Sequence, residues 1–298
     1  MNPVTIQLFY TLEEALLFSL VTIGVFVSFR LLKFPDLTSE GGFGFAAIMG
    51  GVVTVSTSSP VLGVCAGAVG GALWGLITAL LANITKLPTI LASILSMTMA
   101  VSAGLLIVAQ PNISVPDIWL VRQLFPFIVS PVILGVVGGF VFLLIIISAL
   151  YLFCQTGMGF ILRTRGENPR LCQELGYSLT AWDIIGLCMA NAIVGTAAAL
   201  FAQRSGYASI DMGRGIAIAA LAAIMLGESI FLHQTIIQAL AGCFLGTLIL
   251  RLVRMLALNF GMPEGSLDLV TSLMVVVFYY VAKGRSDRGE GVLENIRM

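Results

Sequence analysis

The sequence is poor in charged residues, and this scarcity limits the kind of protein that it can encode. Charged residues make up 10% of the 298 positions, whereas 58% are hydrophobic and the mean hydropathy is +1.04. A soluble domain carries roughly 25% charged residues, because its surface faces water. The fifteen basic and fifteen acidic residues balance. No long run of either sign occurs, which argues against a nucleic-acid partner.

The sequence also lacks the residue patterns on which many enzymes depend. His233 is the single histidine, so a histidine cluster cannot hold a metal. Neither a G-x-x-x-x-G-K-[ST] loop for ATP nor a G-x-S-x-G nucleophile elbow is present. The five cysteines show neither metal-ligand spacing nor a disulfide pattern. We therefore expect no catalytic residue, metal or cofactor in this chain.

Long apolar runs are what the sequence has in abundance. A run of about 20 apolar residues spans a bilayer, and its backbone must be hydrogen-bonded within the segment, which predicts helices. We expect one all-α integral membrane domain over residues 1–298, a polytopic bundle of about nine membrane-embedded helices. The expected segments lie near residues 12–32, 43–57, 60–82, 88–109, 126–153, 181–203, 214–231, 234–258 and 266–282.

Two of these segments have unusual lengths. The run 43–57 is too short to cross the bilayer fully, which predicts a half-helix or a steeply packed one. The run 126–153 is long enough to tilt or to project beyond the bilayer. Glycines recur every fourth residue in the run 60–82 and in two later runs, which predicts close helix packing. They are Gly63, Gly67, Gly71, Gly75, Gly135, Gly139, Gly242 and Gly246.

The orientation follows from the lysines and arginines, which favour the cytoplasmic side. If the polar stretch 156–180 is cytoplasmic, ten basic residues fall inside and five outside. This places the N-terminus outside and the C-terminus inside. Loss of one marginal segment, most easily 43–57, would reverse the N-terminal half.

The polar stretch 156–180 contains signals for a short helix. Asn168 followed by Pro169 is typical of a helix start. Gly176 is typical of a helix end in the left-handed conformation. These residues predict a helix over 170–175, and Thr180 with Asp183 predicts the start of the next helix. A simple cytoplasmic connection is the alternative interpretation.

This stretch resembles the cytoplasmic coupling loop of ABC importer permeases in the branched-chain amino acid and ribose family. That loop typically reads G-x-N-x-x-x-A-x-x-x-G. Gly166, Asn168 and Gly176 match it, and Cys172 stands where alanine is usual.

Two further stretches carry the same resemblance. The sequence Phe-Pro-Asp-Leu-Thr at 34–38 resembles an N-terminal motif of the family and is most similar to its tryptophan/tyrosine branch. Residues 191–228 also resemble that branch. The resemblance covers residues from about 12 to 282.

The resemblance implies a permease subunit of an importer in the bacterial inner membrane. It would pair with a second permease copy, identical or closely related, with two ATPase subunits and with an external substrate-binding protein. ATP and magnesium would bind to the ATPase subunits. The solute would be an amino acid, with tryptophan and tyrosine as candidates.

The same resemblance makes the loop the expected contact with the ATPase. Charged side chains would set register at its rim, and two leucines four apart would present an apolar face. We expect glycine at its two ends because a positive φ is required there. The predicted coupling residues are Arg163, Arg165, Gly166, Glu167, Asn168, Pro169, Arg170, Leu171, Leu175 and Gly176.

Five polar residues are candidates for the substrate pathway: Asp36, Thr38, Asn191, Asp211 and Glu228. Carboxylates at embedded helices are costly unless they are solvated or cap a helix, and capping is the alternative role of the two aspartates. Each aspartate precedes a similar Ala-Ala-Ile-Met segment, and the two segments enter from opposite sides. They could form an inverted repeat, as in many transporters, although chance similarity is the alternative.

Other functions remain open at this point. A secondary, ion-coupled transporter would need charges inside the membrane, and only Glu228 is expected to lie deep in a span. A channel and a membrane enzyme are further alternatives.

Overall fold

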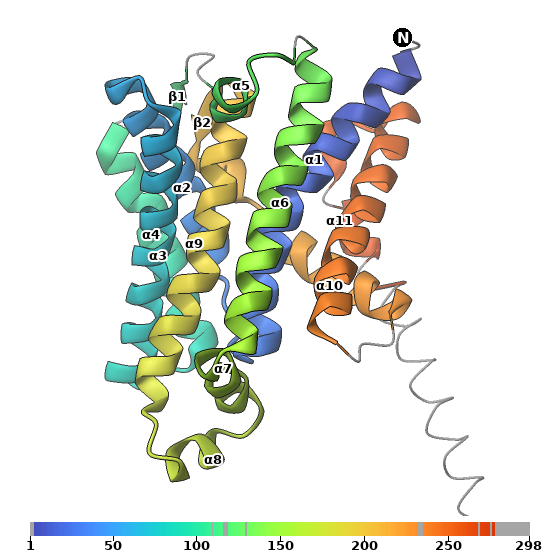
Figure 1. Ribbon diagram of the computed structural model, residues 1–298. Coiled ribbons are helices and arrows are strands. Elements are labelled where there is room, and N and C mark those ends of the chain that lie inside the picture. Colours follow the sequence, from blue (N-terminus) through green and yellow to red (C-terminus); the bar gives the residue numbers. More distant parts are fainter. Residues whose placement is uncertain are drawn as a thin grey trace, which may run out of the picture.

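The computed structural model describes residues 3–108, 110–115, 119–128, 130–231, 235–267, 269–274 and 276–277. Helices dominate it, and the long ones run between the same two ends of the molecule (Figure 1). In chain order the elements are α1 (Pro3–Phe26), the π-helix η1 (Val27–Leu31), α2 (Thr38–Thr57), α3 (Pro60–Ile84), α4 (Thr89–Val108), β1 (Asn112–Ser114), α5 (Leu120–Leu124), α6 (Pro131–Gln155), α7 (Gly157–Glu167), α8 (Pro169–Glu174), α9 (Leu179–Ser205), β2 (Tyr207–Ser209), the 3-10 helix η2 (Ile210–Gly213), α10 (Ile216–Ile230), α11 (Ile236–Asn259) and the 3-10 helix η3 (Glu264–Ser266).

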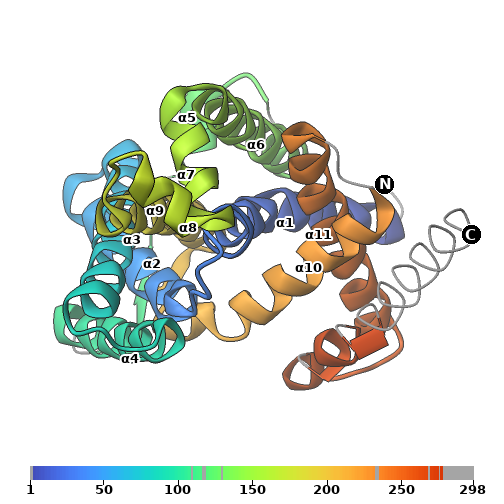
Figure 2. The same cartoon turned by 90° about the horizontal axis from the view of Figure 1, so that it is seen from below.

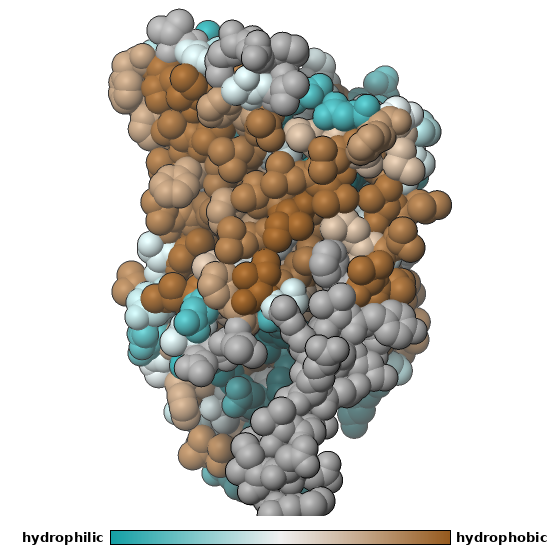
Figure 3. Space-filling model, turned by 90° about the vertical axis from the view of Figure 1, so that its right-hand side faces the viewer, coloured by the Kyte–Doolittle hydropathy of each residue, from teal (hydrophilic) through white to brown (hydrophobic). Residues whose placement is uncertain are grey.

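Seven helical segments of the described chain are long and apolar enough to cross a membrane. Figure 3 shows the apolar belt that they form on one face, with hydrophilic residues gathered toward the two ends. The segments are Thr5–Leu31, Pro60–Ile84, Thr89–Val108, Pro131–Gln155, Leu179–Ser205, Ile210–Ile230 and Ile236–Asn259. Each overlaps a segment expected from the sequence. The all-α, polytopic membrane architecture is therefore confirmed.

The count of about nine embedded helices stays a prediction, because the other two segments are not among these seven. Residues 266–282 lie partly outside the described residues. The run 43–57 belongs to α2, which starts at Thr38 and has 20 residues. At 1.5 Å per residue such a helix is about 30 Å long, so a half-helix was the wrong prediction.

The chain before α6 also differs from expectation. The run 126–153 does not form one long helix, because α6 begins only at Pro131. Proline suits the first helical position, where its missing N–H would have no partner in any case. The residues ahead of it form the short helix α5 and a turn.

Helix α2 lies inside the bundle and packs against α3, α4 and α9 (Figure 2). Glycine makes this possible. A Cβ atom at Gly41 would lie 2.2 Å from the Met97 carbonyl oxygen on α4. Protein rather than lipid surrounds α2, so the helix tolerates a less apolar composition than its neighbours.

The glycine-rich face of α3 packs against α9, as the spacing predicted. A Cβ atom at Gly71 would lie 2.0 Å from the Asn191 carbonyl oxygen, and one at Gly75 would lie 2.3 Å from the Leu187 carbonyl oxygen. On α11, a Cβ atom at Gly246 would lie 1.9 Å from the Ala223 carbonyl oxygen of α10. Contacts this close need glycine, since any side chain would push the two backbones apart.

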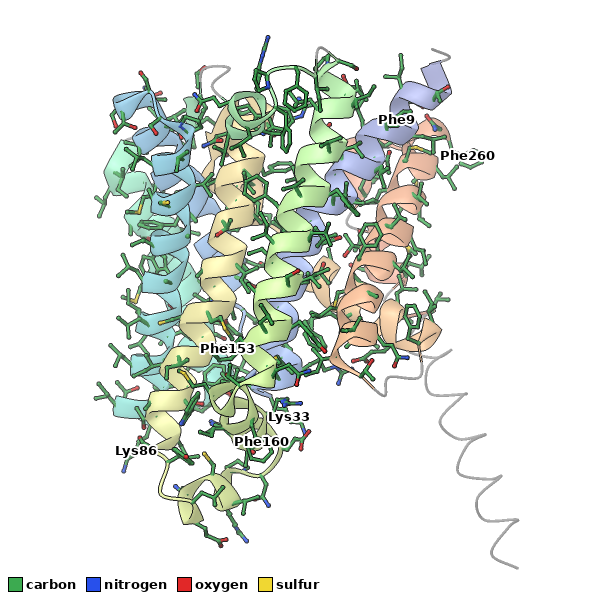
Figure 4. All side chains as sticks on the ribbon, in the orientation of Figure 1. Phe9, Lys33, Lys86, Phe153, Phe160 and Phe260 are labelled. Carbon is green, nitrogen blue, oxygen red and sulfur yellow. The ribbon has the colours of Figure 1, made fainter. Side chains whose placement is uncertain are left out.

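One small sheet, unexpected from the sequence, joins the two halves of the chain. Strands β1 and β2 pair antiparallel, with Ile113 opposite Ala208. We call the end of the bundle that carries this pair the ribbon end and the opposite end, which carries α8, the α8 end (Figure 1). Lys33 and Lys86 lie at the α8 end, and Phe9 and Phe260 lie at the ribbon end (Figure 4).

Candidate functional site

Three of the predicted pathway residues, Asp36, Thr38 and Asn191, meet in the interior. Asp36 lies between η1 and α2 and is buried, as is Asn191 on α9. The Asn191 side-chain amide donates to Asp36 Oδ2 at 2.7 Å, and the Thr38 backbone N–H donates to Asp36 Oδ1 at 2.9 Å. These two hydrogen bonds satisfy both oxygens of the buried carboxylate. Asp36 therefore both supports the start of α2 and ties it to α9.

A chain of hydroxyl groups continues from this pair. The Thr38 and Thr78 hydroxyls are 2.7 Å apart, and Thr78 donates to the Ser96 hydroxyl at 2.7 Å. All three are buried. They connect α2, α3 and α4, so the Asp36 cluster holds four elements together by polar contacts that lipid cannot replace.

The start of α2 also touches the segment between α9 and α10. A Cβ atom at Gly44 would lie 2.2 Å from the Ile210 carbonyl oxygen, and one at Gly213 would lie 1.9 Å from the Glu40 carbonyl oxygen. The chain enters α2 from the α8 end and enters β2–η2 from the ribbon end. The two segments therefore enter from opposite ends, as expected for an inverted repeat.

The other two pathway candidates lie elsewhere. Asp211 pairs with Arg214 at 2.9 Å, and both side chains are exposed. Glu228 forms an ion pair with Arg30, which joins the end of α10 to η1. The Glu228 side chain is 28% exposed. It is a paired residue near the α8 end and does not stand as an isolated charge deep in a span.

The short helix predicted in the polar stretch is present as α8. The Asn168 side chain accepts from the Leu171 N–H at 3.1 Å, and Pro169 occupies the first helical position. Gly176 has φ of +82°. The Tyr177 N–H donates to the Cys172 carbonyl oxygen, which closes the helix end.

Helix α8 is exposed on nearly all sides. Of residues 167–178 only Cys172 is buried, among Leu162, Leu32 and Trp182. Leu171 and Leu175 are 41% and 53% exposed. One side chain therefore anchors this helix, and the apolar face expected on it is open.

Helix α7, between α6 and α8, was missed because residues 157–167 are too polar and glycine-rich to form an apolar run. Thr156 gives the local signal that could have revealed it, since its hydroxyl accepts from the Gly159 N–H and caps the helix. Arg163 donates to the Cys154 carbonyl oxygen at 3.0 Å. Helix α7 is thus fastened to the end of α6.

Helix α7 also contacts η1 and α9. A Cβ atom at Gly166 would lie 2.0 Å from the Leu31 carbonyl oxygen. Arg165 donates to Asp183 Oδ2 on α9 at 2.9 Å, and Asn83 on α3 donates to the same oxygen at 3.2 Å. Helix α7 is therefore joined directly to η1 and α9, and through Asp183 to α3.

Three predictions about this region were wrong in detail. Gly166 is helical and has no positive φ, so it is glycine because of close contact with η1. Arg165 faces Asp183 instead of the loop rim. Helix α9 is capped by Ser178, whose hydroxyl accepts from the Ala181 N–H, while Thr180 donates to Asn83. Distant partners position Gly166, Arg165 and Thr180, whereas the Ser178 cap is local.

Charged residues that the sequence analysis did not select lie at the ribbon end. Arg204, near the end of α9, donates to Glu13 Oε2 of α1 at 2.9 Å. Its guanidinium carbon lies 5.2 Å from the ring centroid of Trp119 and 5.7 Å from that of Tyr10. Arg251 on α11 pairs with Glu14 at 3.3 Å. Arg251 and Glu14 line a cavity of about 790 Å³, and Asp211 lines it as well.

Among the residues that the structure describes, three His, Cys, Asp or Glu side chains nowhere gather closely enough to hold a metal ion. The arrangement is one of packed helices, buried polar contacts and an exposed helix at one end.

Known proteins resemble this chain over most of its length. The profile of the family described as "Branched-chain amino acid transport system / permease component" matches residues 7–281. The chain is 28% identical to the tyrosine transport system permease protein of Clostridioides difficile (strain R20291) over 267 residues, 90% of this chain and 88% of that protein.

A second relative matches a smaller part. The chain is 26% identical to a nucleoside ABC transporter permease protein of Lactococcus lactis subsp. cremoris (strain MG1363) over 164 residues, 52% of this chain and 49% of that protein. No solved structure matches the chain. The long family match and the polytopic helical fold agree, and the chain belongs to the family of branched-chain amino acid transport system permease components.

Proposed function

We propose that this chain is the membrane-spanning permease subunit of an ABC importer and forms the pathway for a small solute. A separate ATPase subunit drives it by docking on α8. The α8 end then faces the cytoplasm of a bacterial cell, which places the N-terminus outside and the C-terminus inside. An external binding protein delivers the solute at the ribbon end, and a second permease copy completes the pathway.

The exposure of α8 is the observation that carries this proposal. A short helix with capped ends protrudes from the bundle and is held by one buried side chain, Cys172. Leu171 and Leu175 are open at its surface, next to the exposed Tyr177. Apolar side chains that project beyond the apolar belt are typical of a protein contact. Arg170 and Glu167, both exposed, are available to set its register.

The connection behind α8 supports a mechanical role. Gly166 touches the backbone of Leu31, and Arg165 is paired with Asp183. A displacement of α8 therefore reaches α9 and also η1, which continues α1, through these close contacts. The same displacement reaches the connection between η1 and α2. Asp36 lies in this connection and is bonded to Asn191 in the centre of the bundle.

The solute is an amino acid in this proposal, and an aromatic one such as tyrosine or tryptophan is favoured. The match to the tyrosine transport permease covers nine-tenths of this chain, whereas the match to the nucleoside permease covers half. Uptake of labelled tyrosine, tryptophan and a nucleoside by cells that carry the complete importer tests the choice. Uptake that is equal with and without the chain would contradict the proposed function.

The docking surface has matched tests. Leu171→Asp should abolish co-purification with the ATPase. Gln173→Asp, on the same helix, places an equal charge outside the leucine face and should retain co-purification.

Gly166→Val should uncouple ATP hydrolysis from uptake because valine would collide with Leu31. Its control is Gly157→Val, since nothing lies within 4 Å of a Cβ atom at that position. Leu171→Asp and Gly166→Val proteins with wild-type binding and uptake would rule out α8 as the docking element.

A further inference from the structure

A cavity of about 790 Å³ lies between α1, the start of α10, α11 and the helical residues that follow η3. It is separate from the Asp36 cluster and from α8. Gln7 on α1 and Tyr207 on β2 line it, which places its mouth near the ribbon end. Its volume falls within the range of about 300–1,000 Å³ that is usual for sites of small ligands.

Among the described residues that line this cavity, the charged side chains leave an excess of one positive charge. Three arginines and two carboxylates line it: Arg214, Arg251, Arg254, Glu14 and Asp211. Arg251 pairs with Glu14 at 3.3 Å, and Arg214 pairs with Asp211 at 2.9 Å. Both carboxylates are therefore already engaged.

Arg254 is the arginine that remains. It lies three residues after Arg251 on α11, so both are on the same side of the helix. No ion pair or hydrogen bond joins Arg254 to any residue that the structure describes. An arginine keeps its charge at any physiological pH. In a membrane span such a charge is retained where it faces a water-filled cavity and a functional partner.

Aromatic side chains complete the wall. Tyr10 and Phe18 come from α1, Phe201 from α9 and Tyr207 from β2. The Arg251 guanidinium lies 3.4 Å above the centre of the Phe18 ring, which holds it in place between the ring and Glu14. Arg251 is thus a fixed part of the wall, whereas the Arg254 guanidinium has no ion-pair partner in the described part of the chain and faces the cavity.

We propose that this cavity binds an aromatic amino acid during transport and that Arg254 pairs with its carboxylate. The planar guanidinium matches a carboxylate with two parallel hydrogen bonds, and the aromatic wall accepts an apolar ring. This inference rests on the proposed import function and adds the site that holds the solute and the residue that recognises its carboxylate.

Equilibrium binding of labelled tyrosine to the purified permease tests the inference, in nanodiscs of phosphatidylcholine so that no anionic lipid competes. Arg254→Gln should weaken binding about 10- to 100-fold, the loss expected for a charge-assisted pair. Arg254→Lys should recover part of the affinity because it keeps the charge. Lys86→Gln removes the same charge at the α8 end and should leave binding unchanged.

A ligand that lacks the carboxylate tests whether Arg254 recognises that group. Tyramine, which keeps the ring and the amine, should compete poorly with tyrosine at the wild-type protein. At Arg254→Gln the preference for tyrosine over tyramine should disappear, which a variant that merely loosens the fold would not produce.

The outcomes separate the two proposals. Tyrosine uptake by cells together with unchanged binding and unchanged preference in Arg254→Gln would overturn the site and leave the import function standing. Equal uptake with and without the ATPase gene would overturn the import function itself. Retention of phosphatidylglycerol that depends on Arg254, with no tyrosine binding, would show a lipid phosphate site and also overturn the inference.

Discussion

Two adjacent glycines of α2 should respond in opposite ways to alanine. A Cβ atom at Gly41 would lie 2.2 Å from the Met97 carbonyl oxygen of α4. At Gly42 the nearest atoms would be the Asn191 side-chain oxygen at 3.8 Å and Trp74 Cβ at 3.9 Å, which are ordinary contacts. We expect Gly41→Ala to destabilise the protein and Gly42→Ala to be tolerated.

The magnitude follows from the geometry. Relief of the Gly41 contact, from 2.2 Å to an ordinary 3.4 Å, requires α4 to move by about 1.2 Å. Ser96 precedes Met97, so its 2.7 Å hydrogen bond with Thr78 would stretch beyond bonding distance. Overpacking costs about 1–3 kcal/mol and the lost bond about 1 kcal/mol. Alanine returns about 1 kcal/mol of helix propensity, which leaves a net loss of about 1–3 kcal/mol.

Gly42→Ala receives the same propensity gain without the collision, so its stability should rise by up to about 1 kcal/mol. Thermal unfolding of the purified proteins in detergent, followed by fluorescence-detected gel filtration, compares the midpoints. Roughly 2–4 °C per kcal/mol makes the two variants distinguishable. A Gly41→Ala protein as stable as the wild type would refute the packing of α2 on α4. Equal losses at both positions would refute the argument from contact distance.

Two further predictions concern the buried pair and the orientation. Asn191→Leu leaves the Asp36 carboxylate without its amide donor, so we expect a loss of about 3–5 kcal/mol, and a clearly smaller loss when Asp36→Asn is also present. Equal losses in both backgrounds, measured by thermal unfolding, would show that the two side chains are not coupled. In a cysteine-free variant, Asn112→Cys should react with an impermeant thiol reagent on intact cells, and Gln173→Cys only after lysis. Labelling of both from the same side would contradict the proposed orientation.

Features that depend on a few neighbouring residues were predictable. The apolar runs revealed the long helices, since each residue that faces lipid must be apolar wherever the rest of the chain lies. The start of α8 at Asn168–Pro169 and its end at Gly176 follow from hydrogen bonds within a single turn. The family resemblance rested on the same local motifs.

Hydropathy failed where protein replaces lipid. The first turn of α2, from Thr38 onward, is too polar for an apolar run, yet it is helical because α3, α4 and η2 enclose it. Helix α7 was missed for a related reason. Gly159 packs on the end of α6, Gly166 packs on η1 and Arg165 pairs with Asp183 of α9, so this helix is held by protein contacts and no apolar run marks it.

The sequence by itself determined the membrane class, most of the helices and the shape of α8. Only the tertiary structure decided which polar residues meet. Asp36 and Asn191 are 155 positions apart and form one buried pair. Glu228 forms an ion pair with Arg30, and Arg254 lines a cavity. Helix boundaries depend on interactions within a turn, whereas the partner of a buried charge depends on how distant helices pack, which no local pattern encodes.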